Sequence, residues 1–372
     1  MGTKYLDEYN AKLGFGFMRL PKLADDTFNM DLVKKMVDVF LAEGFTYFDT
    51  AYSYPGSEEA LREALVKRFP RERYSVATKM PVIQMEKPED AQTFFQTSLN
   101  RTGVDFFDYY LFHALNAINN EKIEELGAWQ FVCGLKASRR IKHLGFSFHG
   151  TPEALDDILT RHPEAEFVQL QINYLDWDDE KVQAYYCYET ARKHGVPITV
   201  MEPIKGGLLA NPPQAVKTVF HTSNTEASPA SWALRFAASL GGIATVLSGM
   251  NSLEQLYDNI ATLKNIKPLS IEERDIIAKV VDIYRTIPRI PCTGCRYCLN
   301  ACPNKIRIPN LIDLYNDYMV HNSTASGKDM YPVFTSGMGK ASDCIQCHIC
   351  KEHCPQGIDI ATIIRSVAEV FE

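Results

Sequence analysis

The chain lacks the features that mark several large classes of protein. No stretch approaches the roughly 18 uncharged apolar residues of a membrane span, and no basic patch followed by an apolar run opens the chain, so we expect neither a membrane anchor nor a secretion signal. Positive charge is not in excess, because 39 Lys and Arg against 46 Asp and Glu leave a net charge of −7. This balance argues against a nucleic-acid surface, and with no secretion signal we expect a cytoplasmic protein.

Cysteine is scarce over most of the chain. Of ten cysteines only Cys133 and Cys187 precede residue 290, and both fall in predicted helices, where we expect inert thiols. The other eight lie between Cys292 and Cys354, a concentration that in a cytosolic chain indicates metal rather than disulfides. Together with the stiff Ile-Pro-Arg-Ile-Pro segment at 287–291, it predicts a large domain at 1–287 and a small one at 288–372.

A complete glycine fingerprint for dinucleotide binding is also missing. Gly14 and Gly16 follow its spacing, but the third glycine is absent and no helix follows promptly. Short apolar runs instead alternate with longer amphipathic ones, which predicts an α/β fold of the (β/α)8 TIM-barrel type, with a doubly wound sheet as the alternative. The candidate strands are 14–18, 47–49, 74–79, 109–113, 143–147, 167–171, 198–201 and 245–248. The candidate helices are 31–43, 57–67, 89–101, 121–138, 152–161, 179–194, 229–239 and 252–263.

Polar or ionisable residues recur where the predicted strands end. Asp49, Lys79, His113 and Ser147 each follow an apolar run, and in a barrel the chemistry belongs at the carboxyl ends of the strands. Each residue alone has a plain structural explanation, such as a turn cap, a solvated rim lysine or a half-buried histidine. Their recurrence on successive strands is what indicates a site.

Several motifs resemble those of the aldo/keto reductases. The segment Phe48-Asp49-Thr50-Ala51-Tyr52-Ser53-Tyr54 resembles the family signature, Ala77-Thr78-Lys79 the segment of its third-strand lysine, and Tyr110-Leu111-Phe112-His113 that of its fourth-strand histidine. The resemblance covers roughly residues 11–265. It implies an oxidoreductase that acts on a small carbonyl or alcohol substrate.

The resemblance implies a catalytic tetrad of Tyr54, Lys79, Asp49 and His113. Hydride reduction of a carbonyl leaves negative charge on oxygen, so a proton donor must lie beside it. Tyr54 is the expected acid, and Tyr52 is the alternative phenol. A Lys79 ammonium is expected to lower the pKa of that phenol, with Asp49 holding the lysine and His113 orienting the carbonyl.

A nicotinamide cofactor, NAD(H) or NADP(H), is also implied. The resemblance assigns Ser147 and Gln169 to the carboxamide. The loop Lys205-Gly206-Gly207-Leu208 offers backbone N–H groups to a phosphate, with a plain turn as the alternative. The final cofactor-binding positions correspond to Ser248, Gly249, Ser252, Gln255 and Asn259.

Among the departures of this chain from the family pattern, three change the charge expected at the cofactor site. Gly249 and Gln255 stand where the family carries a cationic pair for the 2′-phosphate, so we expect NADH to serve at least as well as NADPH. Glu202 brings a carboxylate close to the expected pyrophosphate, which requires a cationic partner such as Lys205.

The tail contains one cysteine motif twice. Cys292, Cys295, Cys298 and Cys302-Pro303 repeat the spacing of Cys344, Cys347, Cys350 and Cys354-Pro355. This spacing is that of bacterial two-cluster ferredoxins, in which the fourth cysteine of each run binds the other cluster. It predicts two [4Fe–4S] clusters in a ferredoxin-like α+β domain, one held by Cys292, Cys295, Cys298 and Cys354, the other by Cys344, Cys347, Cys350 and Cys302. Zinc, the alternative, prefers paired CxxC motifs.

Two hypotheses about function follow from this organisation. In the first, the clusters carry electrons between the barrel and a one-electron redox protein. In the second, the barrel is an ordinary NAD(P)H-dependent reductase and the clusters are structural or sense redox state. The insertion at 303–343 is long for a ferredoxin connector and indicates an added role. We expect a helix at 308–320 and a loop at 321–340.

Overall fold

The computed structural model describes residues 12–372, except residues 26, 181, 225, 293, 295 and 355 and the side chains of residues 325 and 326. These residues form two compact units. The first comprises the described parts of Met1–Pro203 and Ser231–Ser270, and the second those of Ile204–Ala230 and Ile271–Glu372. Besides the cysteine-rich region, the second unit thus includes the segment after the seventh strand and the helix before the tail.

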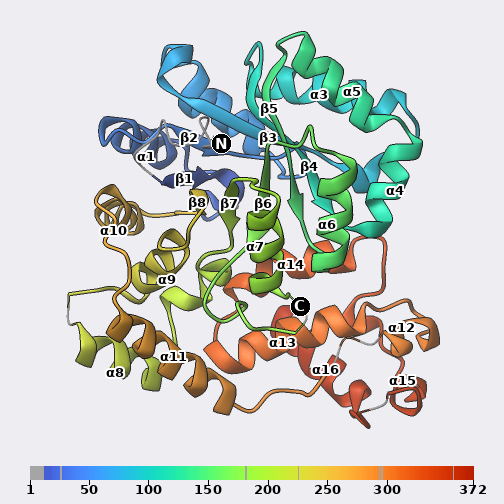
Figure 1. Ribbon diagram of the computed structural model, residues 1–372. Coiled ribbons are helices and arrows are strands. Elements are labelled where there is room, and N and C mark those ends of the chain that lie inside the picture. Colours follow the sequence, from blue (N-terminus) through green and yellow to red (C-terminus); the bar gives the residue numbers. More distant parts are fainter. Residues whose placement is uncertain are drawn as a thin grey trace. The chain divides into compact units, whose positions relative to one another are not determined.

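Eight parallel strands close into a barrel within the first unit (Figure 1). Each strand pairs with its neighbours in chain order, and β1 pairs with β8. The fold class predicted from alternating strands and helices is confirmed, and the doubly wound alternative is excluded. The strands are β1 (Leu13–Gly16), β2 (Tyr47–Asp49), β3 (Ser75–Met80), β4 (Phe107–Leu115), β5 (Ile141–Phe148), β6 (Phe167–Gln171), β7 (Ile198–Met201) and β8 (Ile243–Ser248).

Large side chains from alternate strands fill the barrel. Tyr47, Tyr109, Phe167 and Leu247, from β2, β4, β6 and β8, belong to one buried cluster. The ring centroids of Tyr47 and Tyr109 are 4.9 Å apart, and those of Tyr109 and Phe167 are 5.5 Å apart. Layers built from alternate strands are typical of this fold, which leaves the carboxyl ends of the strands for chemistry.

The helices follow from apolar periodicity and capping. In α1, residues 33, 36, 37, 40 and 41 are buried, the spacing of one helical face, and Asn29 caps the helix by accepting from the backbone N–H of Leu32. The helices are α1 (Met30–Ala42), α2 (Ser57–Leu61), α3 (Glu89–Thr102), α4 (Ala117–Glu125), α5 (Ala128–Ala137), α6 (Pro152–Arg161), α7 (Ala184–Lys193), α8 (Gln214–Ser223), α9 (Pro229–Ala238), α10 (Leu253–Lys264), α11 (Ile271–Thr286), α12 (Tyr297–Ala301), α13 (Ile308–His321), α14 (Ala325–Thr335), α15 (Ile349–Glu352) and α16 (Ile360–Phe371).

Three sequence-based helix predictions need correction. The helix expected at 121–138 is two helices, α4 and α5, separated at Gly127, whose φ of +68° belongs to the left-handed region. The helix expected from residue 179 begins at Ala184. The loop expected at 321–340 contains α14, which continues through Pro332.

The second unit has a core of its own. Leu311 and Ile312 of α13 pack in one buried cluster with Ile360 and Ile364 of α16. Within the same unit, α14 packs against the 3-10 segment Lys205–Ala210 and α8 against α11. In the part of the chain that the structure describes, no helix combines the length and apolarity needed to cross a membrane.

Candidate active site and cysteine pockets

Four of the predicted catalytic residues meet at the carboxyl ends of β2, β3 and β4. Lys79 is fully buried, and its Nζ lies 2.6 Å from Oδ1 of Asp49. The same Nζ donates to the backbone carbonyl of Thr50 at 2.8 Å and lies 5.0 Å from the centroid of the Tyr54 ring. The rings of Tyr54 and His113 meet edge to face with centroids 5.6 Å apart. The structure therefore brings the whole predicted tetrad together.

The electrostatics of this group differ in part from the sequence-based expectation. Burial raises the pKa of Tyr54, and this effect outweighs the opposing attraction of the Lys79 ammonium. The phenol therefore stays protonated at neutral pH rather than becoming easily ionised. Although burial alone lowers the pKa of Lys79, the Asp49 carboxylate and Tyr54 raise it above its ordinary value, so the lysine stays charged beside the phenol.

His113 is held in its neutral form. Desolvation, together with repulsion from Lys79, lowers the pKa of His113 to about 3. At neutral pH the ring therefore carries one N–H donor and no charge. A neutral imidazole can donate a hydrogen bond to a carbonyl oxygen without supplying a proton to it.

Tyr52, the alternative phenol, occupies a different environment. Its ring packs edge to face on Phe94 with centroids 5.0 Å apart, and the guanidinium of Arg101 lies 4.5 Å above its face. Arg101 also donates to the backbone carbonyl of Tyr52. Its ring is therefore packed beside α3, whereas the Tyr54 ring lies beside Lys79 and His113.

An ion pair between the ends of β1 and β7 adds residues that the sequence reasoning missed. Nη1 of Arg19 lies 3.1 Å from Oε1 of Glu202. Both charges affect the pKa of the Tyr54 phenol: Arg19 lowers it and Glu202 raises it. Burial has a larger effect than either charge. Glu202 has a φ of +54°, and its backbone carbonyl accepts from Nδ2 of Asn173 at 3.1 Å. The expected partner of Glu202 was Lys205, but the cation paired with it in the first unit is Arg19.

His149 is a second histidine at this mouth. Desolvation of its ring by the surrounding protein lowers the pKa of His149, and the carboxylate of Glu202 opposes that shift. His149 also acts on His113, because it contributes to the lowered pKa of that ring. The sequence signal for it was its position directly after β5, two residues beyond Ser147.

The predicted carboxamide positions lie side by side. Ser147 of β5 pairs in register with Gln169 of β6, and both are buried. Among the described residues, Oε1 of Gln169 has no hydrogen-bond partner. A buried acceptor without a partner is costly, so the end of this side chain fits an N–H donor such as a carboxamide.

The remaining predicted cofactor positions have local partners. Asn259 donates to Oγ of Ser248 at 2.9 Å, while Ser252 caps α10 by accepting from the N–H of Gln255. A Cβ placed on Gly249 would lie 3.5 Å from Cβ of Arg19, so the Arg19 stem packs on that glycine. Lys205, Gly206, Gly207 and Leu208 form a tight segment in the second unit, where the φ angles of Gly206 and Gly207 are positive.

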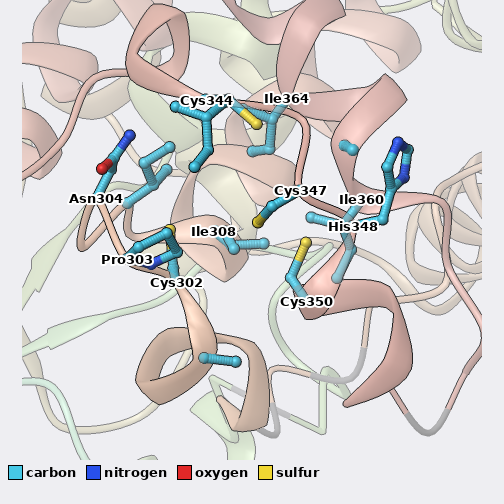
Figure 2. Close-up of a pocket in the computed structure, with 14 residues that line it drawn as sticks. Cys302, Pro303, Asn304, Ile308, Cys344, Cys347, His348, Cys350, Ile360 and Ile364 are labelled. Atoms are coloured by element: carbon cyan, nitrogen blue, oxygen red, sulfur yellow. The ribbon is translucent and has the colours of Figure 1, made fainter.

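Two pockets in the second unit gather the cysteines in crossed sets. One is lined by Cys302 together with Cys344, Cys347 and Cys350, and Figure 2 shows their sulfur atoms around it. The other is lined by Cys292, Cys298 and Cys354. Cys295 lies outside the described residues. Each pocket thus combines the first cysteines of one motif with the last cysteine of the other motif.

The crossed arrangement is compatible with the clusters that the cysteine spacing predicts. Cysteines spread around an apolar pocket suit a cluster, whose irons each take one thiolate.

Comparison with known proteins gives two matches along the chain. The model of the aldo/keto reductase family matches residues 12–282, and that of a 4Fe-4S dicluster domain matches residues 291–358. Aldo-keto reductase str7 of Strobilurus tenacellus is 31% identical over 211 residues, which cover 54% of this chain and 60% of that relative. Probable aldo-keto reductase 1 of Glycine max is 24% identical over 327 residues, or 77% of this chain and 88% of that relative.

Solved structures agree on the barrel. The holo form of an aldo-keto reductase from Bacillus halodurans superposes with a TM-score of 0.59 and 25% identity, over 72% of this chain and 91% of that one. An aldo-keto reductase from Klebsiella pneumoniae in complex with NADPH gives a TM-score of 0.57 at 19% identity, over 73% and 90% of the two chains.

Proposed function

Because the chain belongs to the aldo/keto reductase family and carries a 4Fe-4S dicluster domain, we propose that it interconverts a small carbonyl compound and its alcohol at Tyr54, with electrons exchanged through two [4Fe–4S] clusters. The observation that carries the proposal is the convergence of Lys79, Tyr54 and His113 at one barrel mouth. A charged lysine, a protonated phenol and a neutral imidazole there suit the stabilisation of a developing alkoxide.

Tyr54 acts as the proton donor in the direction of reduction. Its raised pKa keeps the proton on Oη at neutral pH, so the group enters the reaction in the form that can donate. Once the proton has moved to the substrate oxygen, the Lys79 ammonium stabilises the phenolate left behind. Asp49 keeps that ammonium in place through the 2.6 Å contact.

His113 orients the substrate. As a neutral ring with one N–H, it donates a hydrogen bond to the carbonyl oxygen that Tyr54 protonates. Two donors on one oxygen fix its position relative to the reacting carbon, and such positioning accounts for a large share of catalysis.

Ser147 and Gln169 suit the carboxamide of a nicotinamide cofactor. The cofactor would supply or accept a hydride when bound. Gln169 offers the buried, unsatisfied acceptor described above. The Arg19–Glu202 pair neutralises a carboxylate that would otherwise repel an anionic cofactor or substrate at this mouth.

The cysteine pockets suit two clusters. Each cluster would carry one electron, so the two together would match the two electrons of one carbonyl–alcohol interconversion and exchange them one at a time with a redox protein. We assign one to Cys302, Cys344, Cys347 and Cys350, and the other to Cys292, Cys295, Cys298 and Cys354. Thiolate ligands of this kind favour a reducing compartment, the cytoplasm.

The acid is tested by removing one oxygen atom. Tyr54→Phe should lower the rate of carbonyl reduction by about 10²- to 10⁴-fold, the usual worth of a general acid, while cofactor binding and the circular dichroism spectrum stay unchanged. Tyr52→Phe, the matched control, should retain most of the activity. Loss of activity in Tyr52→Phe with retention in Tyr54→Phe would transfer the role to Tyr52.

A further inference from the structure

The strand that carries His113 is interrupted directly after that residue. In β4, Phe112 pairs with Phe146 of β5, and the next pair is Leu115 with Phe148. Two residues, His113 and Ala114, therefore stand opposite the single residue Ser147. This is a β-bulge, a feature that re-aims a side chain beside many active sites.

The bulge has an unfavourable backbone. Ala114 has a φ of +58°, in the left-handed region that a residue with a Cβ adopts only at a cost. Such a conformation persists when its surroundings fix it, and functional sites are where it is often found.

Two buried side chains fix the peptide groups of Ala114. Oγ of Ser147 accepts from the backbone N–H of Ala114 at 2.7 Å, and Nδ2 of Asn119 donates to the carbonyl of Ala114 at 2.7 Å. Asn119 is itself held by the capping box at the start of α4, where it accepts from the N–H of Asn116. Ser147 and Asn119 expose 1% and 8% of their surfaces, so water does not readily replace either bond.

We propose that Ser147 is a positioning residue for His113, acting by holding the strained Ala114 bulge, and that it couples this geometry to the cofactor. The hydroxyl of Ser147 accepts from Ala114 and keeps its own O–H, which would be available to the carboxamide oxygen of a nicotinamide. Gln169, its register partner, would accept from the carboxamide nitrogen. One hydroxyl would thus serve both the cofactor and the backbone that aims the carbonyl-orienting ring. This inference rests on the proposed function for its kinetic consequence and for the cofactor contact, whereas the hold on the Ala114 bulge does not depend on it.

The two roles of Ser147 separate in a double-mutant cycle with Ala114→Gly. Glycine adopts a positive φ without the cost of a Cβ. Ala114→Gly therefore removes the need for the clamp, the hydrogen bond by which Ser147 holds the bulge. It does not replace the lost contact between Ser147 and the cofactor. Ser147→Ala should lower kcat by about 10- to 100-fold, the effect of a small misplacement of a reacting group, and should also weaken cofactor binding. Adding Ala114→Gly should restore most of kcat and leave the cofactor Kd weakened.

One control accompanies the cycle. Ser75→Ala removes a buried hydroxyl at the other end of a barrel strand and should change neither kcat nor cofactor Kd.

An unchanged kcat in Ser147→Ala, or no recovery of kcat in the double variant, would overturn the proposal. The thermal midpoint gives a readout that does not need the reaction. Ser147→Ala and Ser75→Ala should each lower the thermal midpoint. Adding Ala114→Gly should recover a larger fraction of this decrease in the Ser147→Ala background than in the Ser75→Ala background. A wild type without carbonyl reduction would contradict the proposed function, whereas the thermal cycle would still test the clamp.

Discussion

At the residue scale, the pair of Lys79 and Asp49 combines function with a large effect on stability. Both side chains are almost completely buried, and breaking a buried pair by removing one partner leaves an uncompensated charge. Lys79→Met should therefore lower the free energy of unfolding at neutral pH by about 3–5 kcal/mol. Denaturant titration followed by circular dichroism measures the loss.

The pH dependence of this variant identifies the cause. Without Lys79, burial raises the pKa of Asp49 unopposed, so the folded variant binds a proton that the unfolded chain releases. Its deficit in stability relative to wild type should shrink as the pH falls from 7 towards 5. The variant Asp49→Asn/Lys79→Met has no such carboxyl, so its deficit should not shrink as the pH falls. A constant deficit in Lys79→Met would mean that packing, not charge, explains the loss.

His113 makes a contribution of the opposite sign. Its folded pKa of about 3 lies below the ordinary value of 6.5, so below about pH 6.5 the unfolded chain binds a proton that the folded protein does not. Wild-type stability should fall relative to His113→Gln as the pH decreases from 6.5 towards 3, and the difference should be constant above pH 7. Parallel slopes in denaturant titrations across this range would contradict the assignment.

Single residues at the strand ends were predictable, but their interactions were not. Asp49, Lys79 and His113 follow apolar runs in the chain, so their place at the mouth could be inferred from strand pattern. The Arg19–Glu202 pair joins the ends of β1 and β7, 183 positions apart, and no local pattern links them. The net rise in the Tyr54 pKa likewise depends on burial outweighing Lys79, a balance that spacing does not contain.

At the element scale, the crossed pairing of the two cysteine motifs can be tested by measuring the iron content of cysteine variants. The intact protein should contain about eight irons and eight sulfides, because each cubane needs four of both. Cys302→Ala and Cys347→Ala should each remove about four irons, and the double variant should remove no more, because both residues line one pocket. A double variant of Cys302 and Cys298 should lose both clusters.

If each cysteine motif held its own cluster, the iron losses expected for the two double variants would be exchanged. Cys302 and Cys298 would then share a cluster, and Cys302 and Cys347 would not. Stoichiometric zinc in place of iron in the wild type would remove the cluster assignment altogether.

Helices could be predicted from the sequence where the local signals agreed. The predictions were wrong where those signals conflicted. The helix α6 has Thr151 as its cap and Pro152 at its start, and it was expected at its observed bounds. The break at Gly127 lies within an apolar pattern that continues across it, so periodicity alone merged α4 and α5. In α14, Pro332 and neighbouring small residues signal a loop, but Tyr331 lies in the core of the second unit, and packing overrides that signal.

At the scale of the whole molecule, the choice of cofactor follows from missing charge. Neither Gly249 nor Gln255 supplies a cation for a 2′-phosphate, and Lys264 pairs with Glu43 at 2.6 Å. NADH should therefore bind at least as tightly as NADPH. Side-by-side fluorescence titrations of the wild type measure both Kd values. A strong preference for NADPH would require a cation from elsewhere, with Lys205→Ala as the variant to examine next.

One chain joins a reductase barrel to a dicluster domain. The central prediction is therefore that electrons pass between the substrate and the clusters. Under anaerobic conditions, the visible absorbance of the clusters reports their oxidation state during addition of an alcohol or carbonyl substrate with its cofactor. We expect substrate to bleach or restore this absorbance in the wild type, and Tyr54→Phe to leave it unchanged. Turnover of the wild type with the cluster absorbance unaltered would contradict the account and assign the clusters a structural or sensing role.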